Sequence, residues 1–226
     1  MNILFGTSKK HDKQMRLLAG AEAMKNRAVF FSALKIDPAN ITSGLLVHGK
    51  TVAVVNNKNL GKIIPDTDAL VTNLNNICLT ITIADCVPIF FIDKKHGAIG
   101  IAHAGWKGVL KKIAFEVIET MTQAYSSNPA DIEIQIGPHI LGCHFEVQAD
   151  VAKQFSKYSD LILNREGKKF VNLQSVIKQQ LIEAGVNPEN IHLTKECTFC
   201  NQDYFSYRRD KPEDVKSQVA YIIKRD

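Results

Sequence analysis

Apolar and polar residues alternate along several short stretches of the chain, as they do in half-buried strands. The alternation is strict over residues 79–83 and 132–136. Two continuous apolar runs, 88–92 and 98–103, flank the segment 93–97, whose sequence DKKHG is typical of a hairpin turn. These patterns predict a sheet that contains an antiparallel hairpin.

Other stretches show the periodicity of helices. Apolar residues recur every three or four positions over residues 106–124, which predicts one amphipathic helix. Further helices are expected at 25–34, 151–158 and 173–184, and further strands at 43–48, 50–55, 192–195 and 218–223. Because strands and helices are interspersed and hairpins are tight, we expect a mixed sheet. No linker or repeat divides the chain, so residues 1–226 are expected to form a single domain.

Composition narrows the classes of function. The chain has 226 residues with 45% hydrophobic residues, which is enough to bury a core without disulfides. The net charge of +5 comes from scattered lysines and arginines, a pattern that argues against nucleic acid but is compatible with anionic small substrates. No apolar run is long enough for a membrane span, and the first residues lack the pattern of a signal peptide. Five cysteines, an odd number, then favour reduced thiols and a cytoplasmic location.

The predicted hairpin places a cysteine and a histidine near its open end. If residues 93–96 form the loop, paired residue numbers sum to 189 and Cys86 lies directly opposite His103; a five-residue loop makes them diagonal neighbours on opposite faces. The pair can be a buried thiol beside a core histidine, a nucleophile with its base, or two metal ligands. A metal needs a third ligand, and His48 at the end of an apolar strand is the best candidate.

Other residues can bind an anion or move a proton. Gly105 and Gly108 flank Lys107 where a strand meets a helix, which favours either an anion site or an ordinary tight turn. Of the adjacent Arg208 and Arg209, one can form an ion pair while the other meets a ligand phosphate. The alternative is a purely structural ion pair with Asp210 or another carboxylate. A further pair, Asp85 and Glu146, supplies candidates for proton transfer.

The remaining cysteines carry weaker predictions. Cys143 and His144 are adjacent and lack the gap usual for two ligands of one tetrahedral metal, so they are interpreted as structural. Cys197 and Cys200 form a lone CxxC, and no second pair at similar spacing completes a zinc ribbon.

Several motifs occur together in the order of one known family. They are DALVT at 68–72, ADCVP at 84–88, HAGWKG at 103–108, IGP at 136–138, CT at 197–198 and SYRRD at 206–210. Over about residues 47–210 the chain resembles the laccase-domain family, also called polyphenol oxidase or purine nucleoside phosphorylase proteins and, in bacteria, peptidoglycan-editing factors.

This resemblance implies a fold, a metal site and an activity. The fold is α+β, with mixed β-sheets sandwiched by helices in αββα-like layers and related to Cys–His toxin deamidases. The metal ligands are His48, Cys86 and His103, with Zn²⁺ as the expected ion and copper as the alternative. The activity is phosphorolysis of adenosine, inosine or methylthioadenosine to the base and ribose 1-phosphate, with deamination of adenosine as a second reaction.

Within that expected site, Cys86, His103 and Asp85 are catalytic candidates, and Lys107 and Arg208 are candidates for binding phosphate. The sequence also departs from the family pattern. The motif HAGW is followed by Lys107 where arginine is usual, which keeps the charge but loses bidentate geometry. The glycine-rich serine segment of many members is not recognisable before His48, which affects the expected substrate contacts.

Three other functions are compatible with the same residues. A metal-free Cys86–His103 pair can act as a hydrolase or deamidase on cell-wall precursors. A mononuclear copper site can support polyphenol oxidation, although multicopper oxidases use His-x-His pairs and the seven histidines here contain none. A non-enzymatic accessory protein can hold zinc for structure, with Cys143 or His144 as the fourth ligand.

Overall fold

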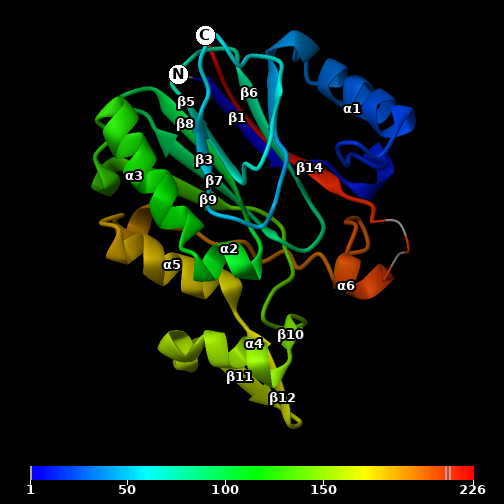
Figure 1. Ribbon diagram of the computed structural model, residues 1–226, viewed down its shortest axis with the longest axis vertical. Helices are drawn as coiled ribbons and strands as arrows, with labels where there is room; N and C mark the ends of the chain where they lie inside the picture. The colour runs from blue at the N-terminus through cyan, green and yellow to red at the C-terminus, as the bar shows by residue number, and fades with distance from the viewer. Residues whose placement is uncertain (1, 212, 214) are drawn as a thin grey trace.

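Two mixed sheets lie against each other between helices in the computed structural model, which describes residues 2–211, 213 and 215–226 (Figure 1). The first sheet has five strands in the order β1-β14-β6-β2-β4. These are β1 (Asn2–Thr7), β14 (Gln218–Arg225), β6 (Cys78–Ile83), β2 (Ile41–Gly44) and β4 (Ile63–Ile64). Helix α1 (Ala21–Ala33) covers the outer face of this sheet.

The second sheet has six strands in the order β13-β9-β7-β8-β5-β3. These are β13 (Ile191–His192), β9 (Glu133–Ile136), β7 (Val87–Asp93), β8 (Ala98–Ala104), β5 (Ala69–Thr72) and β3 (Val52–Val54). Its outer face is covered by α2 (Trp106–Leu110), α3 (Ile113–Tyr125) and α5 (Leu173–Glu183). The predicted α+β fold with αββα-like layers and mixed sheets is therefore confirmed.

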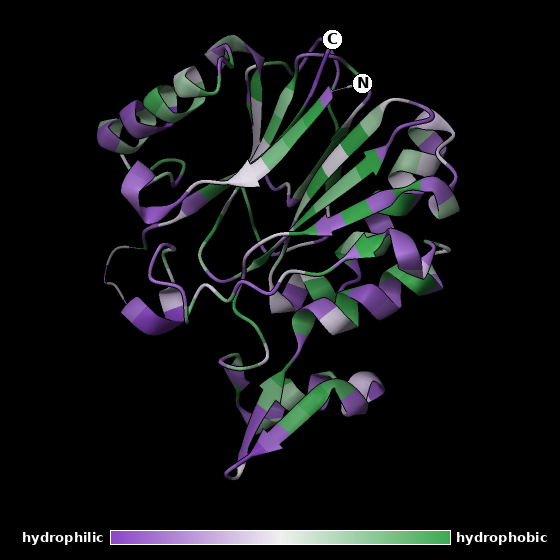
Figure 2. Cartoon of the chain, turned by 180° about the vertical axis from the view of Figure 1, so that it is seen from behind, coloured by the Kyte–Doolittle hydropathy of each residue, from purple (hydrophilic) through white to green (hydrophobic). Residues whose placement is uncertain are grey.

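Buried residues alternate between two faces along the central strands. Phe90 and Ile92 of β7 pack between the two sheets, whereas Ile89 and Phe91 pack beneath the helices. Both faces of the strand are therefore shielded from solvent, which explains why its sequence is a continuous apolar run. Figure 2 shows the apolar colour concentrated on these strands and on the inner sides of the helices.

A small lobe projects from the layers at the bottom of Figure 1. It contains a three-stranded sheet of β10 (Glu146–Val147), β12 (Lys168–Val171) and β11 (Ile162–Arg165), with helix α4 (Ala149–Gln154). Short 3-10 turns lie at Lys10–Asp12, Pro38–Asn40, Pro129–Asp131, Ser156–Leu161 and Pro188–Asn190, and a last helix, α6, spans Tyr207–Asp210. No helix in the described ranges is both long and apolar enough to cross a membrane.

The hairpin register differs from both predicted alternatives. Asp93 pairs with Ala98 and Pro88 with His103, so paired numbers sum to 191 rather than 189 or 190. Cys86 therefore lies two positions away from His103 along the ladder, just before β7 begins. A shift of two from the first alternative keeps both residues on one face of the sheet, because side chains alternate with a period of two.

The prediction of one long helix over residues 106–124 is wrong in one respect. The segment forms two helices, α2 and α3, because Lys112 adopts a left-handed conformation with φ of 59° and breaks the helix between them. Of the two alternatives at its N-terminus, an anion site or an ordinary tight turn, the five-residue length of α2 favours the tight turn, because so short a helix has a small dipole.

Candidate metal and substrate site

Three residues from separate parts of the chain meet at one edge of the six-stranded sheet. His48 lies in the loop between β2 and β3, Cys86 directly precedes β7, and His103 is near the end of β8. One nitrogen of each imidazole and the sulfur all lie within 4.8 Å of one another. The two imidazole rings stand edge to face, with centroids 4.8 Å apart. The set can therefore offer two nitrogens and one sulfur to a metal ion.

Asp68 fixes the orientation of His103. Its carboxylate Oδ1 lies 2.9 Å from Nδ1 of His103, and its backbone oxygen accepts the backbone N–H of the same histidine at 2.8 Å. Both side chains are buried. A carboxylate at Nδ1 sets the tautomer and leaves Nε2 available as an acceptor or ligand, an arrangement common behind metal-bound histidines.

The same carboxylate also shapes the loop that carries His48. It accepts backbone N–H groups from Val47, His48 and Gly49 at 3.2, 2.9 and 2.8 Å. His48 itself has a left-handed φ of 57°, so it does not end a strand as predicted. The three hydrogen bonds to Asp68 stabilise that unfavourable conformation. One buried carboxylate thus positions two of the three candidate ligands.

The electrostatics of the trio favour a thiolate beside a charged imidazole. Burial tends to raise the pKa of Cys86, but the neighbouring His103 and His48 outweigh it and lower that pKa to about 6. Burial likewise opposes charge on His103, yet Cys86 and Asp68 raise its pKa to about 9. A thiolate is the form of cysteine that binds metals and attacks electrophiles.

Gly105 leaves the space in which the three side chains meet. A Cβ at this position would lie 2.9 Å from Cδ2 of His48, 3.2 Å from Sγ of Cys86 and 3.7 Å from Cε1 of His103. The φ of Gly105 is −69°, an ordinary value, so glycine is needed here for the close approach and not for backbone conformation.

A cavity of about 850 Å³ opens beside the trio. Its lining includes the three side chains together with Trp106, Phe145 and Arg208. This volume is within the range of small-molecule sites. Lys107, the other predicted phosphate ligand, is not among the lining residues: it is exposed, and its ammonium lies 5.6 Å from the centroid of the Trp106 ring. The structure therefore does not place Lys107 at the site.

The two adjacent arginines, Arg208 and Arg209, have different surroundings. Arg209 donates to the carbonyl oxygens of Thr198, Phe199, Asn201 and Tyr204 and pairs with the Asp210 carboxylate at 2.7 Å. Its guanidinium is fully used in holding this segment together.

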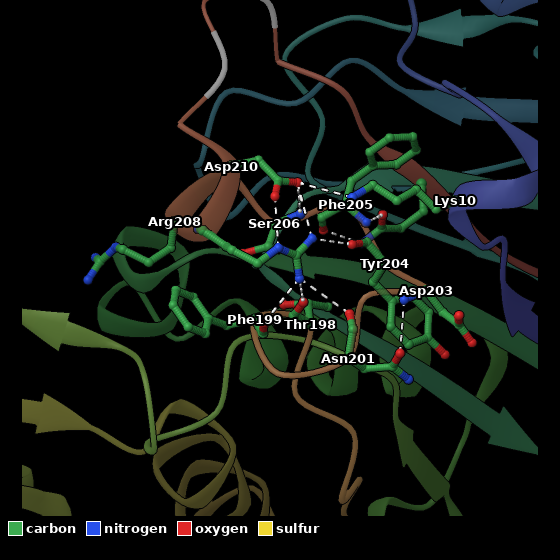
Figure 3. Close-up of polar contacts among 12 residues, drawn as sticks. Lys10, Thr198, Phe199, Asn201, Asp203, Tyr204, Phe205, Ser206, Arg208 and Asp210 are labelled. Atoms are coloured by element: carbon green, nitrogen blue, oxygen red, sulfur yellow. Dashed lines mark hydrogen bonds and ion pairs between the residues drawn. The ribbon is translucent and has the colours of Figure 1, made fainter.

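Arg208 points away from that network in Figure 3 and toward the cavity. Its Nη1 donates to the backbone oxygen of Glu146 at 2.7 Å, and its guanidinium lies over the Phe145 ring. No carboxylate of the residues that the structure describes forms an ion pair with Arg208. The guanidinium thus keeps donors available for a bound anion.

Asp85 lies next to Cys86, but its carboxylate is occupied. Oδ1 accepts the Thr198 hydroxyl at 2.6 Å, and Oδ2 accepts the Ser206 hydroxyl at 3.1 Å and the Arg208 backbone N–H at 2.7 Å. Asp85 is buried and has a φ of 84°. These contacts join the turn before β7 to the segment that carries both arginines.

Comparison with known proteins identifies the family. Residues 19–224 match the family described as multi-copper polyphenol oxidoreductase laccase. The chain belongs to this family. The resemblance inferred from the motifs of the sequence is therefore confirmed.

The chain is similar in sequence to proteins that are named as enzymes. It is 31% identical over 214 residues to "Purine nucleoside phosphorylase YlmD" of Bacillus subtilis, which covers 89% of the chain and 75% of that protein. It is 34% identical over 149 residues to "Adenosine deaminase RL5" of an unknown prokaryotic organism, which covers 63% of the chain and 56% of that protein. The crystal structure of YlmD from Geobacillus stearothermophilus superposes with a TM-score of 0.90 at 26% identity, covering 99% of the chain and 92% of that structure.

Sequence reasoning missed Asp68 as a functional residue of this laccase-family site. In the sequence, Asp68 is the first residue of the DALVT motif, and nothing in the motif itself indicates its role. The available signal was its position directly before an apolar strand, β5, that pairs with β8. Extending the pairing of Ala69 with Ala102 by one residue puts Asp68 opposite His103.

A second cluster also differs from the sequence interpretation. Cys143 and His144 lie together with Cys197 and Cys200, and their four potential ligand atoms are all within 4.8 Å of one another. The CxxC therefore does have a partner pair, distant in sequence and without the usual gap. Neither Cys143 nor His144 belongs to the group around Cys86, so neither supplies its expected fourth ligand.

Proposed function

We propose that this chain is a zinc-dependent purine nucleoside enzyme. Its reactions are phosphorolysis of adenosine or inosine, and of methylthioadenosine, to the base and ribose 1-phosphate, with deamination of adenosine as a second activity. The observation that carries the proposal is the convergence of His48, Cys86 and His103 at the wall of a cavity that Arg208 also lines. The names of similar proteins, purine nucleoside phosphorylase and adenosine deaminase, support the same reactions.

The residues present fit a metal ion. Two imidazole nitrogens and one thiolate are ligands that zinc prefers, and three protein ligands leave one position for water or substrate. Gly105 provides the open space between them, and Asp68 holds the proton on Nδ1 of His103 so that Nε2 can bind. A zinc ion in this position would polarise a bound oxygen atom and lower the pKa of a bound water. Copper is the alternative ion for the same donors.

Arg208 is the proposed ligand for phosphate. Phosphorolysis requires a phosphate oxygen to be held in line with the sugar carbon from which the base departs, and it passes through a cationic sugar. The guanidinium of Arg208 lies at the cavity wall, and its backbone is anchored to Asp85. It can therefore orient the phosphate and keep its negative charge facing the developing cation.

The apolar part of the wall is the proposed place for the purine. Trp106 and Phe145 line the cavity together with Leu46 and Val151, which leaves room for a flat, weakly polar base against aromatic and aliphatic surface. Asp85 serves as a positioning residue in this proposal, because its three hydrogen bonds hold Arg208 relative to Cys86.

Product analysis with zinc-loaded protein tests the proposal. Inosine with phosphate should yield hypoxanthine and ribose 1-phosphate, while adenosine should yield adenine and, separately, inosine with ammonia. Replacement Cys86→Ala should abolish both reactions, whereas Cys78→Ala, which removes a thiol buried in another core beneath α1, should not. Absence of base release by the zinc-loaded wild type, or full activity of Cys86→Ala, would overturn the proposal.

A second candidate function rests on a specific observation. Cys86, His103 and Asp68 follow the order of a nucleophile, its base and an orienting carboxylate, and the pKa of Cys86 is lowered to about 6. We propose as the alternative a metal-free hydrolase or deamidase that uses the Cys86 thiolate. Stoichiometric alkylation of Cys86 by iodoacetamide in zinc-free protein as purified would favour it. Protection of Cys86 by bound zinc would favour the nucleoside enzyme.

A further inference from the structure

Four residues that do not line the cavity form a second donor cluster. They are Cys143, His144, Cys197 and Cys200. We propose that this cluster binds a structural Zn²⁺ ion with three thiolates and one imidazole. The cluster is independent of the three residues at the cavity, so the proposal does not depend on the proposed enzymatic function.

The spacing of the donor atoms matches a tetrahedral site. Zinc bonds of about 2.3 Å to sulfur and about 2.0 Å to nitrogen place two sulfurs about 3.8 Å apart, and a sulfur and a nitrogen about 3.5 Å apart. The sulfurs of Cys143 and Cys200 lie 3.9 Å apart, and Nδ1 of His144 lies 3.2 and 3.3 Å from them. All four donor atoms, including that of Cys197, lie within 4.8 Å of one another, so small side-chain movements would bring them to these separations. The sulfurs are too far apart for a disulfide, whose bond length is about 2.05 Å.

Backbone N–H groups surround the most buried sulfur of the cluster. Cys197 is 5% exposed, and its Sγ accepts the N–H of Leu141 at 3.5 Å as well as N–H groups of Phe199 and Cys200. Hydrogen bonds to a sulfur stabilise its thiolate form, which is the form that binds zinc. The CxxC turn is thus shaped to present a metal ligand.

The orientation of the His144 imidazole explains how two adjacent residues, Cys143 and His144, can bind the same ion. The backbone turns tightly there, with the N–H of His144 donating to the carbonyl of Leu141 at 3.0 Å. The ring of His144 stacks on Phe199 with centroids 4.1 Å apart and an angle of 15°. This stacking directs Nδ1 toward the sulfurs of both Cys143 and Cys200. Two neighbouring residues can therefore serve one ion.

A complete set of four protein ligands is typical of structural zinc. The ion would join two segments that are 57 residues apart in the sequence. One segment continues into Phe145 and Glu146 at the cavity wall, and the other supplies Thr198, whose carbonyl holds Arg209. Arg208, the neighbour of Arg209 in the chain, donates to the Glu146 carbonyl of the first segment. Zinc at this site would therefore hold the Arg208 side of the cavity in place.

Metal analysis of four proteins tests the inference: the wild type, Cys86→Ala, Cys200→Ser and the control Cys78→Ala. Each is purified from zinc-supplemented cells without chelator and its zinc content measured by mass spectrometry. Cys200→Ser should hold one equivalent less than the wild type, whereas Cys78→Ala should match it. Cys86→Ala should retain the second ion, and X-ray absorption at its zinc edge should show three sulfur neighbours and one nitrogen.

The absorption measurement keeps the inference testable even if Cys200→Ser fails to fold, because the cluster is intact in Cys86→Ala. If the wild type holds one equivalent of zinc and Cys86→Ala retains it, the result would support zinc binding at the cluster and contradict a zinc ion at the cavity. Absence of zinc from Cys86→Ala, iron in its place, fewer than three sulfur neighbours, or a mass lower by two hydrogens from a disulfide would each overturn the inference.

Discussion

Asp68 and His103 face each other across neighbouring strands, with the carboxylate oxygen 2.9 Å from Nδ1 of the imidazole. Burial tends to raise the pKa of Asp68, yet hydrogen bonds from His103 and from the loop at Gly49 lower it below its usual value. The carboxylate therefore stays charged and holds its partners over the working pH range. Two strands and one loop are joined at this single side chain.

The first prediction concerns this carboxylate. Replacement Asp68→Asn keeps the shape of the side chain but removes its charge and one acceptor, so both His103 and the loop of His48 lose their support. We expect zinc affinity at the cavity site to fall about 10- to 100-fold, as is common for such supporting carboxylates. Competition with a chromogenic chelator measures the change. The exposed Asp66→Asn is the matched control, and equal zinc affinity in the two variants would contradict the assigned role.

A methyl group at residue 105 should disable the site without unfolding the protein. In Gly105→Ala the added Cβ lies too close to His48 and Cys86, while the φ of −69° suits alanine. We expect base release from inosine to fall at least 100-fold, because the added methyl displaces the side chains that must converge. Thermal unfolding should move by only a few degrees. An active variant would show that Gly105 is not needed for this close approach. A variant that unfolds well below the wild type would show that the methyl group disrupts the fold and not the site alone.

Arg208 should control the affinity for phosphate. Arg208→Ala removes the guanidinium that lines the cavity, so the KM for phosphate in phosphorolysis should rise about tenfold or more. Arg208→Lys should recover only part of the loss, since an ammonium cannot donate in bidentate fashion. Lys107→Ala should have a smaller effect because Lys107 does not line the cavity, and the exposed Lys111→Ala serves as control. A phosphate KM that depends more on Lys107 than on Arg208 would reverse this assignment.

Stability should decrease in mild acid because of one histidine. Burial lowers the pKa of His139 to about 4, and the hydrogen bond between Nδ1 and the Gly137 carbonyl opposes this only in part. In the unfolded chain the value is near 6.5, so unfolding takes up a proton between these limits. The contribution of neutral His139 is therefore complete above pH 6.5 and is lost as the pH falls toward 4, by up to about 3 kcal/mol.

Urea unfolding of the wild type and His139→Gln at pH 7 and pH 4.5 isolates this contribution. The free energy of unfolding should fall less on acidification in the variant than in the wild type. His11→Gln, at an exposed histidine, should show the slope of the wild type. Parallel behaviour of all three proteins would rule out His139 as the source of acid sensitivity.

The sequence predicted the centre of the fold well because its strands are apolar on both faces. The hairpin of β7 and β8 was recognisable from its two continuous runs, but its register was wrong by two positions from the first alternative. The loop consists of residues 94–97 rather than 93–96, since Asp93 still pairs with Ala98. The strand β1 was missed because its exposure does not alternate regularly. Strands β4, β10, β11 and β12 were missed because they are short or largely exposed, and β5 was missed although it is buried, because it has only four residues.

In the candidate site, too, the contacts within a local element could be predicted from the sequence, whereas the contacts between distant segments could not. Cys86 and His103 could be placed near each other because a short hairpin connects them. The role of Asp68 depends on the pairing of β5 with β8, which no local pattern reveals. The partner of the CxxC lies 57 residues away from Cys200 and follows no spacing rule. Contacts set by the packing of distant segments were therefore the part that the sequence did not reveal.

The antiparallel pairing of β1 with β14 has a consequence for the order of folding. Asn2 pairs with Arg225, so the first described strand has to wait for a partner that lies 223 residues further along the chain. β14 also separates β1 from β6, and the five-stranded sheet cannot close before it arrives. The hairpin of β7 and β8 needs only local contacts, which form fastest. Nascent chains should therefore pass through a stage in which the apolar face of β8 is not yet covered by the five-stranded sheet. At that stage the exposed face is prone to aggregation unless chaperones bind it.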